Sequence, residues 1–154
     1  MERDAESIQT RLEELKARCR KSGMNVTPQR IAVYRALLES EEHPTPEALF
    51  ASVREGMPSI SLATIYKTLE ALQRLGVCHE ISRLGEARRF EANLDDHHHT
   101  VCTRCGRVAD FDDERLGSLS PPPGLDGFVP TGIHVQVVGL CGACAGSPDP
   151  DDEI

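Results

Sequence analysis

The sequence predicts an α+β fold, in which a helical N-terminal part with a short hairpin precedes a smaller part rich in strands and cysteines. Up to residue 75, apolar residues recur at helical spacing and each run is bounded by start and stop signals for a helix. Beyond residue 97, β-branched residues and paired cysteines replace that pattern. The 154 residues suffice for one domain or two small ones.

Four helices are expected first, each opened by a capping residue or a charged turn and closed by a glycine or proline. Thr27-Pro28 and Thr45-Pro46 each place a threonine as N-cap before a proline at the first helical position. Ser61 caps the last helix, which Gly76 closes. The expected helices span residues 6–21, 28–38, 46–53 and 62–75.

A short basic hairpin is expected behind the helices. Residues 77–81 and 88–91 read as its two strands, with a turn around Gly85. Further strands are expected over residues 97–110 and 128–140. A helix from Leu116 to Gly124 would be cut short by three consecutive prolines. The expected organisation is a first domain over 1–91, a hinge over 92–96, a second domain over 97–146 and a disordered acidic tail over 147–154.

Charge is distributed unevenly along the chain, whose formal net charge is −8. Residues 1–91 contain 14 basic and 14 acidic residues, whereas residues 92–154 contain 3 and 11. Six basic residues and no acidic one lie between Lys16 and Arg35. This stripe is either a solvated helix face or a surface for the phosphates of nucleic acid. No apolar run is long enough to cross a membrane and no signal segment opens the chain, which favours the cytoplasm.

Four of the six cysteines form two Cys-x-x-Cys pairs, Cys102 with Cys105 and Cys141 with Cys144. Two such knuckles complete a tetrahedral all-sulfur site, which suits structural zinc. Two disulfides or a redox motif are the alternatives, but a cytoplasmic chain disfavours disulfides and a redox motif needs only one pair. The remaining two cysteines, at positions 19 and 78, are expected to be small buried apolar residues.

A run of three histidines precedes the first cysteine pair. In a strand, His97 and His99 would point to one face and the middle histidine to the other. Two imidazoles at this spacing make half of a site for Fe(II), Mn(II), Zn or Ni, with Glu91, Asp110 and His43 as candidates for the other half. The alternative is a solvated histidine run, with His43 an ordinary loop residue.

Five stretches of the chain, in order, together resemble the ferric uptake regulator family of bacterial metal-dependent repressors over about residues 10–145. The stretches are Gly23 to Arg30, His43-Pro44-Thr45, Ser61 to Leu69, His97-x-His99-x-x-Cys102-x-x-Cys105-Gly106, and Gly139-Leu140-Cys141-x-x-Cys144. The resemblance implies an N-terminal winged-helix DNA-binding domain, a small C-terminal α/β dimerisation domain, a four-cysteine structural zinc and a regulatory metal site at the hinge.

The resemblance also assigns the regulatory ligands. They fall on His43, Glu91, His97, His99 and Asp110, and the ion would be Fe²⁺ or Mn²⁺. The chain is most similar to the peroxide-responsive PerR branch, in which His43 and His97 would be the oxidisable residues. Glu91 stands where that branch usually has aspartate, and a longer carboxylate that chelates the ion would fill its open position. An iron-responsive repressor of iron uptake without peroxide sensing is therefore the alternative.

Some members of the family have an additional metal site, and this sequence departs from it. Ile133 replaces a histidine ligand and Gly117 replaces an acidic one. We therefore expect His98 and His134 to be exposed, or to lie behind the metal ligands, rather than to bind an ion.

The helix from residue 62 is expected to read DNA. Its apolar stripe would face the core, while Ala63, Thr64, Lys67, Ala71 and Arg74 form a small, basic opposite face suited to a major groove. The family resemblance makes Tyr66 at the edge of the stripe a base contact. Expected backbone and wing contacts are Gln29, Arg30, Lys16 to Lys21, Arg83, Arg88 and Arg89. A two-fold homodimer implies a palindromic double-stranded operator.

Two other classes of function are alternatives to a DNA-binding repressor. A metalloenzyme is disfavoured because no general base stands beside an open position of the ion. A zinc-ribbon adaptor that does not bind DNA would leave the face around Thr64, Tyr66 and Lys67 without a purpose. The sequence therefore predicts a regulator rather than an enzyme.

Overall fold

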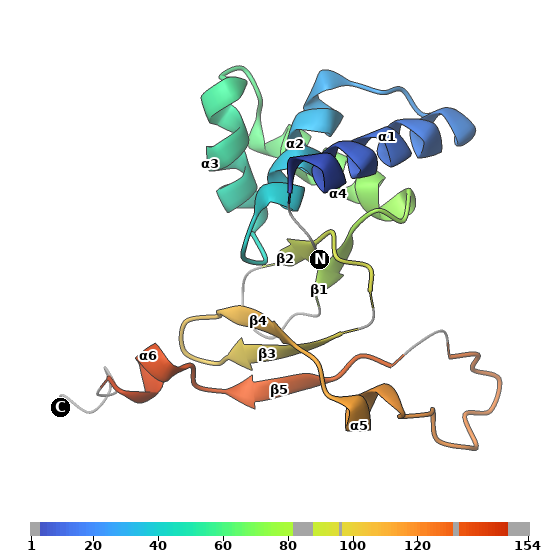
Figure 1. The fold of residues 1–154 in the computed structure, drawn as a ribbon, viewed down its shortest axis with the longest axis vertical. Coiled ribbons are helices and arrows are strands. Elements are labelled where there is room, and N and C mark those ends of the chain that lie inside the picture. Colours follow the sequence, from blue (N-terminus) through green and yellow to red (C-terminus); the bar gives the residue numbers. More distant parts are fainter. Residues whose placement is uncertain (1–3, 82–87, 96, 131–132, 148–154) are drawn as a thin grey trace. The chain divides into compact units, whose positions relative to one another are not determined.

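The computed structural model describes residues 4–81, 88–95, 97–130 and 133–147. The chain divides into two compact units, Met1–Asp95 and Asp96–Ile154, whose elements are labelled in Figure 1. No helix among the described residues is long and apolar enough to cross a membrane.

The first unit begins with the four expected helices. They are α1 (Ala5–Lys21), α2 (Pro28–Glu39), α3 (Pro46–Gly56) and α4 (Leu62–Arg74). The capping residues act as the sequence predicts, because the Thr27 hydroxyl accepts from the Arg30 backbone N–H at 3.2 Å and the Ser61 hydroxyl from that of Thr64 at 3.1 Å. Each bond satisfies a donor that the first helical turn leaves without a partner.

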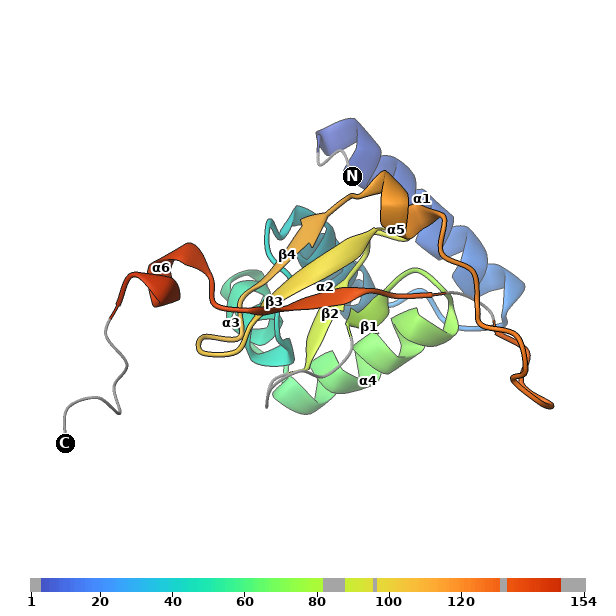
Figure 2. The ribbon, with the colours of Figure 1, turned by 90° about the horizontal axis from the view of Figure 1, so that it is seen from below.

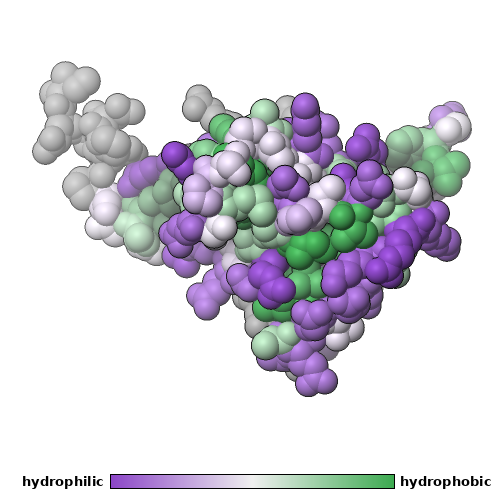
Figure 3. All heavy atoms as spheres, turned by 90° about the horizontal axis from the view of Figure 1, so that it is seen from above, coloured by the Kyte–Doolittle hydropathy of each residue, from purple (hydrophilic) through white to green (hydrophobic). Residues whose placement is uncertain are grey.

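One apolar core joins the four helices. The largest fully buried side chains include Tyr34, Leu12, Leu15, Leu38, Leu49, Ile65, Leu69 and Leu72. Polar contacts anchor α1 on this bundle, since Arg11 donates to the Tyr34 hydroxyl at 3.4 Å and Arg18 donates to the Leu75 carbonyl at 3.0 Å. Figure 3 shows apolar side chains gathered in a furrow between hydrophilic ones on the helical face. A groove of about 650 Å³ lies between α1, α2 and α3.

A two-stranded hairpin completes the first unit. Strands β1 (His79–Ile81) and β2 (Arg89–Glu91) are antiparallel, with His79 opposite Glu91 and Glu80 opposite Phe90. Phe90 is fully buried, and the hairpin packs on α2 and α4. The expected turn around Gly85, which includes Arg83, lies outside the described residues.

The second unit is built on a three-stranded sheet with the order β4-β3-β5. It contains β3 (His98–Cys102), β4 (Val108–Phe111), α5 (Glu114–Gly117), β5 (Gln136–Gly139) and α6 (Gly142–Ala145). Strand β3 is central, antiparallel to β4 and parallel to β5, as Figure 2 shows. Strand β5 therefore lies at an edge of the sheet.

Three expectations for the second unit are wrong in detail. The strand expected over 97–110 is a pair of strands, which turn at Gly106 with a φ of 68°. The strand expected over 128–140 is confined to Gln136–Gly139. Its predicted beginning is irregular because Phe128 and Val129 are 67% and 83% exposed, and no strand in the described part of the chain pairs with them. Helix α5 begins before residue 116 because Asp113 caps it, accepting from the Arg115 backbone N–H at 2.9 Å.

Candidate functional site

The four paired cysteines converge within the second unit. Their four sulfur atoms, on Cys102, Cys105, Cys141 and Cys144, all lie within 4.8 Å of one another. The first pair begins at Cys102, the last residue of β3, and the second spans the start of α6, where Cys141 is the N-cap. The Cys105 and Cys141 sulfurs are 3.7 Å apart. A tetrahedral ion with metal–sulfur bonds of ~2.3 Å needs sulfurs roughly 3.8 Å apart, so the cluster fits zinc.

The backbone around this cluster favours thiolates. The backbone N–H of Cys105, followed by that of Cys141, lowers the pKa of Cys102 to about 6, and the Cys141 donor lies 3.3 Å from the Cys102 sulfur. The pKa of Cys141 is also lowered, chiefly by the Cys144 backbone N–H. The pKa of Cys144 is raised to about 12, chiefly by its contact with the Cys141 sulfur. All six cysteines are free of disulfides, and the four paired ones converge on one another as a single four-sulfur cluster.

The other two cysteines are core residues, as the sequence predicts. Cys19 is fully buried in the helical core and Cys78 is 3% exposed. Burial raises the pKa of the Cys78 thiol to about 12, so it stays protonated. Neither belongs to a group of possible metal ligands among the described residues.

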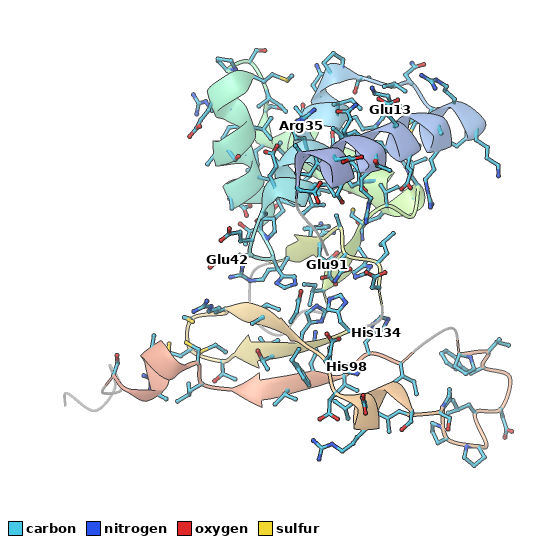
Figure 4. The ribbon with its side chains drawn as sticks, in the orientation of Figure 1. Glu13, Arg35, Glu42, Glu91, His98 and His134 are labelled. Atoms are coloured by element: carbon cyan, nitrogen blue, oxygen red, sulfur yellow. The ribbon has the colours of Figure 1, made fainter. Side chains whose placement is uncertain are left out.

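The first unit brings two imidazoles to one carboxylate, and we call His43, His79 and Glu91 the hairpin cluster. The His43 Nε2 atom lies 3.2 Å from Glu91 Oε2, and the His79 Nε2 atom lies 2.5 Å from Glu91 Oε1. His43 and Glu91 are buried, whereas the His79 side chain is 40% exposed. Figure 4 labels Glu91 on the hairpin. Arg89 holds the loop of His43 in place by donating to its carbonyl at 2.8 Å.

The second unit brings two imidazoles to another carboxylate, and we call His97, His99 and Asp110 the sheet cluster. Asp110 Oδ1 lies 3.6 Å from His97 Nε2 and 3.5 Å from His99 Nε2. His99 and Asp110 are directly opposite across β3 and β4, and the two imidazole rings are 4.6 Å apart. These donors are the ones that first-row divalent ions take from proteins.

His98 lies on the opposite side of β3, as strand alternation predicts. Its ring packs 5.6 Å from that of Phe111, and the residue is therefore only 8% exposed. Of the two positions that we expected for His98, exposed or behind the metal ligands, the exposed one is wrong. His134 is exposed, as expected. Figure 4 labels both residues.

The outer face of α4 carries most of the side chains expected to read DNA. Ala63 and Lys67 are exposed, while Thr64 and Tyr66 are half-buried. The Tyr66 hydroxyl donates to a Glu47 carboxylate oxygen on α3 at 2.8 Å, which raises the pKa of Tyr66. Ala71 does not belong to this face, because it is 2% exposed in the core.

The hairpin supports this face from one side. Arg88 donates two hydrogen bonds to Glu80, at 3.0 and 2.7 Å, and its guanidinium lies 5.9 Å from the centre of the Tyr66 ring.

The other residues expected to contact DNA lie at the start of α2 and in the turn of the hairpin. Gln29 is exposed at the start of α2, whereas Arg30 donates to the Asn25 carbonyl. Arg83 lies outside the described residues.

The sequence did not predict three residues that contact expected site residues. These are His79, Glu47 and Glu80, which contact Glu91, Tyr66 and Arg88. Each is placed by packing or register between segments distant in sequence. For His79 a signal existed, because pairing residues 77–81 with 88–91 around Gly85 sets position 79 opposite position 91. The other two depend on how α3 and the hairpin lie against α4.

Together, the capped helices and the two-stranded wing define a winged-helix DNA-binding domain, and the second unit is a small α/β domain with a cluster of zinc-ligand type. The model of the ferric uptake regulator family matches residues 21–121. The chain belongs to this family, whose members are transcription regulators and not enzymes.

Relatives support the same assignment. The peroxide-responsive repressor PerR of Staphylococcus epidermidis is 33% identical over 145 residues, covering 94% of this chain and 97% of that protein. The Helicobacter pylori ferric uptake regulator superposes with a TM-score of 0.77 at 22% identity, covering 92% of this chain and 96% of that one, which shows the fold. The Campylobacter jejuni peroxide stress regulator is 30% identical with a TM-score of 0.60, covering 86% and 98%.

Proposed function

We propose that this protein is a metal-dependent, DNA-binding repressor that acts in the cytoplasm as a homodimer on a palindromic operator. One observation carries the proposal: each unit holds its own cluster of imidazole and carboxylate donors, on either side of the hinge. His43 and Glu91 would supply two ligands, and His97, His99 and Asp110 three.

Because the ligands are divided between the two domains, binding of the ion can change the arrangement of these domains. Neither two nor three donors saturate a first-row ion, so an ion gains ligands when both clusters bind it together. Its binding free energy then favours those arrangements of the two domains in which the clusters meet. Fe²⁺ or Mn²⁺ is the regulatory ion in this proposal. Zn²⁺ in the four-cysteine cluster does no chemistry, because four thiolates leave no open position.

In this proposal a second copy of the chain pairs with the edge strand of the sheet. Among the residues that the structure describes, strand β5 is paired on one side alone, and its Val137 and Val138 are each 49% exposed. An edge strand with apolar residues favours pairing with another strand. Two-fold pairing here would present two copies of α4, each reading half of a palindrome through Ala63, Thr64, Tyr66 and Lys67.

We further propose that the regulatory site responds to peroxide, as the name of the PerR relatives indicates for those proteins. A bound ferrous ion would supply the reducing chemistry that cleaves peroxide. His43 and His97 each lie beside a ligand carboxylate. Gain of one peroxide oxygen by either imidazole, with the other oxygen leaving as water, removes a ligand and releases the operator. The alternative is an iron-responsive repressor, favoured by the longer carboxylate of Glu91.

Operator binding by protein loaded with Fe(II), Mn(II) or Zn(II), with and without low peroxide, tests this proposal. The expected result is that peroxide releases DNA from the Fe(II) form alone. Mass spectra of that form should show one added oxygen atom on a peptide containing His43 or His97. If the Fe(II) protein stayed bound to the operator in peroxide and its histidines were unmodified, the proposal of peroxide sensing would be wrong and the iron-responsive alternative would hold.

A further inference from the structure

The hairpin register places a histidine opposite a proposed metal ligand. His79 and Glu91 are directly paired across β1 and β2. Directly opposite residues on an antiparallel pair have Cβ atoms about 5 Å apart, on the same face. The His79 Nε2 atom reaches Glu91 Oε1 at 2.5 Å, which makes this the shorter of the two imidazole contacts to that carboxylate.

The two oxygens of Glu91 therefore face different imidazoles. Oε1 faces His79, which has no place among the proposed ligands, and Oε2 faces His43, which has one. A carboxylate that chelates an ion must bring both oxygens to about 2 Å from it. An oxygen held by an imidazole N–H across the hairpin is turned away from that geometry. Glu91 then offers the ion a single oxygen.

We propose that His79 is a positioning residue that restricts Glu91 to one-oxygen ligation of the regulatory ion and so keeps one coordination position open. This inference rests on the proposed function. Five residues that each give one atom fill five of the six positions of an octahedral ion. Chelation by Glu91 would fill the sixth. The His79 contact thus compensates for the longer side chain at position 91, and a small oxidant such as peroxide can reach the ion.

The contact is specific to the pairing of these two strands. A slip of one residue would move His79 to the other face of the hairpin. Glu91 is 5% exposed, so the position of its carboxylate is set by protein groups more than by water. The neighbouring residue on β1, Glu80, pairs with Arg88 instead, which makes it a control for general loosening of the hairpin.

The number of water molecules bound to Mn(II) tests the inference, measured by ¹⁷O and proton relaxation on the full-length, zinc-containing protein. His79→Leu removes the donor, whereas His79→Gln keeps an N–H near the position of Nε2. We expect the wild type, His79→Gln and the control Glu80→Gln to retain one bound water. We expect His79→Leu to lose it, and the added change Glu91→Asp to restore it.

A second measurement does not need the loaded metal. In ¹⁵N spectra of the metal-free wild type, His79 should carry its proton on Nε2 in a hydrogen bond that Glu91→Gln weakens. An unchanged water count in His79→Leu, or a count that also falls in Glu80→Gln, would overturn the inference while leaving the proposed function intact. If His79→Leu abolished Mn(II) binding as His43→Ala does, His79 would be a ligand and the inference wrong. Wild-type protein that binds no ion beyond its zinc would overturn both proposals.

Discussion

At the scale of single residues, Tyr66 is a residue that we propose contacts a DNA base, and its contact with Glu47 would set which hydrogen bond its hydroxyl offers to that base. A tyrosine hydroxyl has one proton to donate, and here that proton goes to Glu47 at 2.8 Å. Toward a base edge the hydroxyl then acts as an acceptor, which favours the amino group of adenine or cytosine in the major groove.

Replacing Glu47 with alanine should therefore weaken base discrimination. The freed hydroxyl can donate as well as accept, and a negative charge near the DNA phosphates is lost. We expect binding to non-operator DNA to tighten, and discrimination against a substituted base at the position read by Tyr66 to fall by about 1 kcal/mol. Titration of labelled duplexes at fixed salt measures both quantities. Glu55→Ala on the exposed end of α3 is the control, and equal effects from the two variants would contradict this role.

At the scale of elements, the helix boundaries follow from local chemistry, whereas the strands do not. Thr27, Thr45 and Ser61 each accept a backbone N–H from the third residue beyond them, as their place before an apolar run predicts. Strand β5 is shorter than its β-branched residues suggest, because a strand extends only where β3 is available to pair with it. That pairing is not local and could not be predicted from composition.

Ser61→Ala tests how much one such cap contributes. Its hydroxyl accepts from Thr64 N–H at 3.1 Å and also contacts the Thr64 hydroxyl at 2.9 Å. Loss of an N-cap hydroxyl costs about 1 kcal/mol, so the free energy of unfolding should fall by that amount. Urea unfolding of the metal-loaded protein measures it, with the nearby exposed Ser59→Ala as control. A variant as stable as wild type would show that α4 does not depend on this cap.

The metal-ligand residues show the same division between local and non-local information. The cysteine pairs and the His-x-His pattern could be predicted because ligand spacing within a knuckle or strand is short-range. The contact between His79 and Glu91 needs the register of the hairpin, and that between Tyr66 and Glu47 needs the packing of α4 on α3. Residues that adjust a site thus come from tertiary structure more than from motifs.

At the scale of the whole molecule, the second domain should depend on its zinc. Its sheet has three strands, α5 and α6 contain no buried residue, and few of its side chains are buried. Structural zinc contributes on the order of 10 kcal/mol to folding in small domains. Cys102→Ser should therefore lose the tightly bound zinc and most of the dimer.

Zinc content by mass spectrometry and oligomeric state by analytical ultracentrifugation check this expectation. Cys19→Ser, outside the cluster and in the first domain, should keep both zinc and the dimer. A Cys102→Ser protein that is dimeric and stable without zinc would contradict the role given to the cluster.

The central claim is that an ion held jointly by His43 and Glu91 of the hairpin cluster and by the sheet cluster controls DNA binding. Operator affinity with and without Mn(II) tests it most directly. We expect wild-type protein to bind the operator tightly only with Mn(II). The ion favours the arrangement of the two domains of each chain in which both copies of α4 in the dimer can reach the operator. His99→Ala should keep its structural zinc and its fold, yet bind the operator equally weakly in both conditions. Metal-free wild-type protein that binds the operator as tightly as the Mn(II) form would contradict the claim.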